Sequence, residues 1–274
     1  MLRKLMKHEL RATGRLMLPL FLLVLVTAVG ANFSTKTLLE TDSSVLNILG
    51  VIVMSAFTIA IIAVCVMAFV LMIYRFYKNL LQDEGYVMMT LPVSVHQHII
   101  SKLLVSMLWF VLSAIVLMLA CFVLVYDVGL VADFFAGLEG LLVEIGAEKY
   151  VLDAIIFAIE LVIVMFMGAA ASCLNIYLAL AIGHSFANRK LLMSVVAYFV
   201  IQFALEIVFG IISSIFFRFA DGGFLLDIEN YFTQIGSLAG AHVAMLVVLV
   251  VATVSAAIYY FPTVWVMKHK LNLE

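Results

Sequence analysis

The chain has 274 residues, of which 66% are hydrophobic and 12% charged, about half of the roughly 25% charged residues that soluble domains carry. No water-soluble fold can bury that much apolar surface, so soluble globular domains are excluded, in agreement with a mean hydropathy of +1.25. The net charge of -2 carries no basic excess, and nucleic acid is not an expected partner. Because apolar runs extend from end to end, we expect one transmembrane domain over residues 1–274.

Six stretches are long and apolar enough to span a bilayer, whose hydrocarbon core of about 30 Å needs about 20 residues. They lie at about residues 16–33, 46–74, 102–126, 153–183, 191–217 and 241–267. Helices satisfy their own backbone hydrogen bonds in lipid, and the stretches lack the alternating pattern of barrel strands. The sequence therefore predicts an all-α, polytopic membrane protein.

The N-terminal segment combines a basic stretch with leucines at amphipathic spacing. Residues 2–13 are predicted to form an interfacial helix that leads into the first span. A secretory signal peptide is the weaker interpretation, because the basic region is long and no small-x-small cleavage site follows it.

Lysine and arginine are distributed unequally between the connections. Most of them fall in the N-terminal segment, in the connections after the second and fourth stretches, and in the C-terminal tail. The other connections contain only Lys36, Lys149 and Arg218. By the positive-inside rule this asymmetry predicts that both termini are cytoplasmic.

The sequence offers no set of residues for catalysis. There is no phosphate loop of the GxxxxGKS or GxxxxGKT kind and no HExxH motif, so neither ATP hydrolysis nor a zinc-protease site is expected on this chain. The three cysteines lie in separate apolar runs without CxxC spacing. His96 and His98 are two residues apart, which on a helix points them in different directions. We therefore predict no metal, no cofactor and no enzymatic activity for this chain.

The connection between the second and third stretches is the most informative segment. Residues 75–104 read RFYKNLLQDEGYVMMTLPVSVHQHIISKLL, too long for a tight hairpin. Gly85 is expected to end a short amphipathic piece, and Pro92 suits a helix start because its missing N–H is not needed there. Two interpretations follow: a solvated connection, or an element that docks onto a partner.

The order of features in this connection resembles the first cytoplasmic loop of type-2 ABC-transporter permeases. In that family a short charged helix precedes a glycine, an apolar stretch, a Leu-Pro-hydrophobic-Ser step and a Ser-Lys-Leu-Leu run. The matching residues here are Asp83, Glu84, Gly85, Tyr86, Thr90, Leu91, Pro92, Val93, Ser94, Ser101, Lys102, Leu103 and Leu104. Two further segments are similar to the family: Lys7-His8-Glu9-Leu10 followed by Arg15 and Pro19, and the 183–190 turn before Ser194 and Tyr198.

The resemblance implies a permease subunit of an exporter in a bacterial plasma membrane, which moves a peptide, antibiotic, lipid-like or ionic substrate outward. It would pair with a second permease, identical or different, and with ABC ATP-binding subunits that hold ATP and Mg. Segment 77–86 would be the coupling helix that fits a cleft in the ATPase, and segment 2–13 the connecting helix. The residues implied in partner binding are Tyr77, Lys78, Asp83, Glu84, Gly85, Tyr86, Leu91 and Pro92. The alternatives are an ion-coupled carrier or channel without an ATPase, and a scaffold or sensor that transports nothing.

Two carboxylates, Glu160 and Glu206, lie well inside predicted spans, and Gln202 precedes Glu206 by one helical turn. A charge near the bilayer centre costs at least about 2.5 kcal/mol on insertion scales, so such residues face a bundle interior or a water-filled path. Either neighbouring helices satisfy these side chains, or they line the substrate route or the seam between two permeases.

Overall fold

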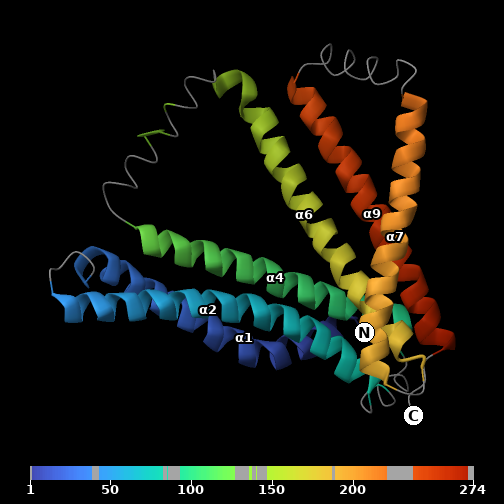
Figure 1. Ribbon diagram of the computed structural model, residues 1–274, viewed down its shortest axis with the longest axis horizontal. Coiled ribbons are helices and arrows are strands. Elements are labelled where there is room, and N and C mark those ends of the chain that lie inside the picture. Colours follow the sequence, from blue (N-terminus) through green and yellow to red (C-terminus); the bar gives the residue numbers. More distant parts are fainter. Residues whose placement is uncertain are drawn as a thin grey trace. The chain divides into compact units, whose positions relative to one another are not determined.

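The computed structural model describes residues 2–38, 43–82, 85, 93–126, 136–137, 140, 147–186, 189–220 and 237–270, which form helices and turns without a strand (Figure 1). The elements in chain order are α1 (Leu2–Phe33), η1 (Ser34–Leu38), α2 (Ser44–Phe76), η2 (Tyr77–Leu81), α4 (Val95–Val125), α6 (Ala147–Gly183), α7 (Lys190–Ala220) and α9 (Ser237–His269). Within these described ranges, six helices are long and apolar enough to cross a membrane. The predicted all-α class is confirmed, and the chain is a multi-pass membrane protein.

The N-terminal amphipathic segment is helical and continues without a break into the first span. α1 has 32 residues and contains Pro19. At 1.5 Å per residue it is about 48 Å long, against a hydrocarbon core of about 30 Å. One end of α1 therefore extends beyond the hydrocarbon.

Clustering of the chain gives two compact units, and the first comprises Met1–Arg75 and Gln97–Ala147. Its apolar core is supplied by α1, α2 and α4, with Met17, Phe57 and Trp109 among the buried residues. Lipid chains are as apolar as these side chains, so close packing and polar contacts must fix the helices together. Near the C-terminal end of α1, Asn32 Nδ2 donates to the Leu124 carbonyl at 2.8 Å.

The second unit comprises Phe76–His96 and Glu148–Glu274. Here η2 packs on α6, and the Phe76 and Tyr177 rings stack with centroids 3.9 Å apart. The C-terminal end of α6 approaches α7 so closely that a Cβ at Gly183 would overlap the Ser194 backbone. Gly183 is therefore required by packing between these two helices.

Gly183→Ala should destabilise the protein, because the added methyl group forces the ends of α6 and α7 apart. Overpacking of this kind costs about 1–3 kcal/mol. Thermal unfolding in mild detergent measures the effect as a lower Tm. Gly168→Ala on the same helix is the control: its Cβ would meet nothing within 4 Å, and alanine should stabilise the helix by up to about 1 kcal/mol. Equal Tm values for the two variants would contradict the close approach.

Candidate functional site

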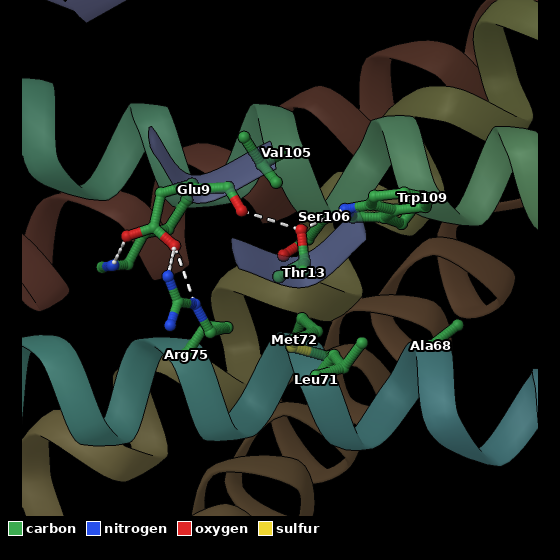
Figure 2. A pocket seen from close by; sticks show the side chains of 10 residues that line it. Glu9, Thr13, Ala68, Leu71, Met72, Arg75, Val105, Ser106 and Trp109 are labelled. Atoms are coloured by element: carbon green, nitrogen blue, oxygen red, sulfur yellow. Dashed lines mark hydrogen bonds and ion pairs between the residues drawn. The ribbon is translucent and has the colours of Figure 1, made fainter. Parts of the chain in front are cut away.

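A buried carboxylate in the first unit joins three helices. Glu9 on α1 is 4% exposed. Its Oε1 accepts a hydrogen bond from Lys102 Nζ of α4 at 2.6 Å, and its Oε2 accepts from Arg75 Nη2 and Nε of α2 at 2.7 and 2.8 Å (Figure 2). Such charge-assisted bonds are about twice as strong as neutral ones. We call Glu9, Arg75 and Lys102 the Glu9 cluster.

A second hydrogen-bond chain extends the Glu9 cluster along α1. Thr13 Oγ1 donates to the Glu9 carbonyl at 2.8 Å and accepts from Trp109 Nε1 at 2.7 Å (Figure 2). The cavity beside these groups has a volume of about 10 Å³, room for about one water molecule. The Glu9 cluster therefore joins helices, and the cavity beside it is too small to receive a substrate.

The Glu9 cluster joins two helix ends that one connection separates in the chain. Arg75 ends the first segment of the first unit, and Lys102 lies six residues into the second, which begins at Gln97. The connection resembling the permease loop lies between these two cations. One carboxylate thus holds the helices on both sides of that connection.

Glu9→Gln should destabilise the protein by about 3–5 kcal/mol, because it leaves the Lys102 ammonium buried without a counter-charge. Lys102 has a side-chain exposure of 3%. The Tm in neutral detergent measures the loss. The exposed Arg3 of the same helix supplies the control Arg3→Gln, with an expected change within about 0.5 kcal/mol. If Glu9→Gln and Lys102→Met add without coupling in the double variant, the pairing is refuted.

The structure describes some of the residues predicted to bind a partner and not others. Tyr77 and Lys78 open η2, and the Gly85 N–H donates to the Gln82 carbonyl at 2.7 Å. A Cβ at Gly85 would lie 2.5 Å from the Leu80 carbonyl oxygen, so glycine is required there. The remaining predicted contact residues lie outside the described residues: Asp83, Glu84, Tyr86, Leu91 and Pro92.

The described start of the 75–104 connection is packed against other residues and is not a solvated linker. Asn79, Leu80 and Leu81 are buried, and the Tyr77 ring meets the His184 ring edge-on at a centroid distance of 5.1 Å. His184 belongs to the turn after α6, and no pattern in the sequence marks it as a contact site. The first part of the 75–104 connection therefore packs against the 184–190 connection.

His184 is held neutral in this contact. It is 1% exposed, and its Nδ1 donates to the Leu180 carbonyl at 2.9 Å. Burial lowers the pKa of His184, a change that the Leu180 carbonyl opposes and the Lys190 charge reinforces. Protonation of His184 would place a buried positive charge against the Tyr77 ring.

His184 should make stability depend on pH. Because its folded-state pKa lies below the unfolded value of about 6.5, the unfolded chain takes up the proton first. Stability is therefore fully present above about pH 6.5 and is lost as pH falls through that value towards the folded pKa. The slope from this residue is at most about 1.4 kcal/mol per pH unit. Tm measured from pH 8 to pH 5 should fall less steeply in His184→Gln, and equal slopes would remove His184 as the cause.

The three predicted residues inside spans do not form one site. Glu160 Oε2 pairs with His242 Nδ1 of α9 at 2.7 Å, a partner that the sequence analysis missed. Gln202 Nε2 donates to Tyr198 Oη at 3.4 Å, one turn back on α7. Glu206 is exposed on the same helix, and within the described ranges no hydrogen bond or ion pair is recorded for it. Glu160 is thus satisfied by a neighbouring helix, whereas Glu206 faces outward from α7.

No family model, curated protein or solved structure matches this chain. In the part of the chain that the structure describes, no group of three or more His, Cys, Asp or Glu side chains could hold a metal ion. The type-2 permease assignment therefore stays a prediction that depends on motifs and on the geometry around Glu9.

Proposed function

We propose that this chain is the membrane-spanning permease subunit of an ATP-driven exporter of the type-2 ABC class. It functions in a bacterial plasma membrane with both termini cytoplasmic. ATP and Mg bind to separate ABC subunits, and a second permease subunit, identical or different, completes the route. The observation that carries the proposal is the convergence of Arg75 and Lys102, from the two sides of the 75–104 connection, on Glu9.

A connection that transmits force from an ATPase needs the two chain segments beside it, which we call its stems, to move together. Each oxygen of the Glu9 carboxylate binds a cation from a different stem. Breaking either contact leaves a buried charge without its counter-charge, which is strongly unfavourable. A displacement of the connection by an ATPase would thus move α1, α2 and α4 together, which suits a coupling element better than a solvated linker.

The contact between Tyr77 and His184 supports the same function. The two basic connections, 75–104 and 184–190, are assigned to the same side of the membrane by their Lys and Arg content. Their described parts touch through these two rings. A partner that binds the first connection would therefore also act on the turn between α6 and α7.

One observation favours an ion-coupled carrier as the second candidate. The Glu160 and His242 pair joins α6 to α9 within the spans, with side-chain exposures of 28% and 23%. Ionisable pairs inside membrane helices occur in proton relays. A carrier would need this pair for transport and would need no ATPase.

Affinity purification of the chain from its native cells in mild detergent tests the two candidates directly. An ATPase with a Walker motif should copurify at about one per permease subunit. Recovery of the chain alone, with transport driven by an ion gradient and abolished in Glu160→Gln, would favour the carrier.

In the assembled complex, Glu84→Ala combined with Tyr86→Ala should lower substrate-stimulated ATPase activity several-fold. Both residues belong to a connection between apolar stretches of the sequence, so membrane levels and copurification should stay near normal. Thr58→Ala is the control, because Thr58 is exposed on α2 and bonds only within its own helix. Unchanged stimulation in the double variant would remove the coupling role from this connection.

A further inference from the structure

One side of α1 carries a row of cations. The exposed residues Lys4, Lys7, Arg11 and Arg15, which we call the basic stripe, recur every three or four positions and so share one face of the helix. The opposite face is the packed one and includes Glu9, Thr13 and Met17. The basic stripe therefore points away from the Glu9 cluster and out of the first unit.

The face that carries the basic stripe continues along α1 as an apolar surface. Leu18, Leu22, Val29 and Phe33 lie on this face and are 62%, 65%, 61% and 58% exposed. Since α1 is long enough to cross the membrane with one end beyond the hydrocarbon, these side chains meet lipid tails. The change from Arg15 to Leu18 takes less than one helical turn. The groups next to the stripe are then the headgroups of the same lipids.

Among the described residues of the first unit, basic side chains far outnumber acidic ones. Glu9 is the only acidic residue in its described part, and both oxygens of that carboxylate are engaged by Arg75 and Lys102. No ion pair is recorded for the four stripe residues within the ranges that the structure describes. The counter-charge for the stripe must come from outside these helices.

We propose that the basic stripe binds anionic phospholipid headgroups in the leaflet at the N-terminal end of α1. Arginine matches phosphate oxygens with a two-pronged set of donors, and clustered Lys and Arg residues beside a membrane helix attract anionic lipid. A lipid is favoured over an acidic protein because the stripe is continuous with the lipid-facing surface of α1. The proposal depends on membrane insertion and is independent of the transport function.

Tryptophan quenching by brominated lipids tests the proposal on the full chain. The chain has two tryptophans, and Leu18→Trp adds a third on the stripe side of α1, where Leu18 is 62% exposed and lies three residues after Arg15. The extra quenching of Leu18→Trp over that of the natural chain, measured in mixed vesicles, reports the lipid beside this part of α1. Leu18→Trp serves as the parent protein for the lipid-binding variants below. Brominated phosphatidylglycerol should bind at least about fivefold more tightly than brominated phosphatidylcholine, the contribution of one basic residue. High salt should reduce the preference.

Replacing all four stripe residues by glutamine should bring the preference to about one. Arg11→Lys with Arg15→Lys keeps the charge and should keep most of the preference. Arg189→Gln with Lys270→Gln removes exposed charge elsewhere and should leave the lipid preference unchanged. Excess inorganic phosphate should not displace the lipid.

Equal binding of the two lipids by the parent protein would overturn the proposal. So would a preference that survives the four glutamines. Loss of an ATPase partner in the four-glutamine variant, with its lipid preference intact, would make the stripe a protein-binding face instead.

Discussion

The three-way contact between Glu9, Arg75 and Lys102 is the interaction on which the first unit depends. Apolar packing alone discriminates poorly between helix arrangements in lipid, because lipid chains offer nearly the same contacts. A carboxylate with two cations has a defined geometry and a high cost of separation. The Glu9 cluster therefore sets how α1, α2 and α4 meet. The hydrogen bonds of Thr13 to Glu9 and of Trp109 to Thr13 extend the contact between α1 and α4 along α1.

The same contact explains how the charges of α1 divide into two functions. Glu9 faces inward and neutralises cations from α2 and α4, whereas the basic stripe faces outward without a described acidic neighbour. The inward set holds the helices on both sides of the 75–104 connection, and the outward set suits an anionic membrane surface. One helix can thus anchor the connection to the bilayer, as the proposed coupling to an ATPase would require.

The six helices could be predicted from the sequence because each is a long apolar run, and lipid permits little else. The Glu9 cluster could not, since its members are far apart in the chain and their meeting is set by tertiary packing. The available signal was a single acid in a basic segment, on the same face as Thr13 and Met17. Likewise, the sequence placed the Glu160 carboxylate inside a span, but its partner His242 lies near the start of a different span. For Glu206, the sequence placed the charge inside a span and did not show that it faces outward from α7.

Amide hydrogen exchange in Glu9→Gln tests most directly whether one carboxylate holds both stems of the connection. Peptides covering Phe76–Leu81 and Gln97–Ser101 should both exchange faster than in the parent protein, while the middle of α9 keeps its protection. Faster exchange confined to the first turns of α1, with both stems unchanged, would contradict the role assigned to Glu9.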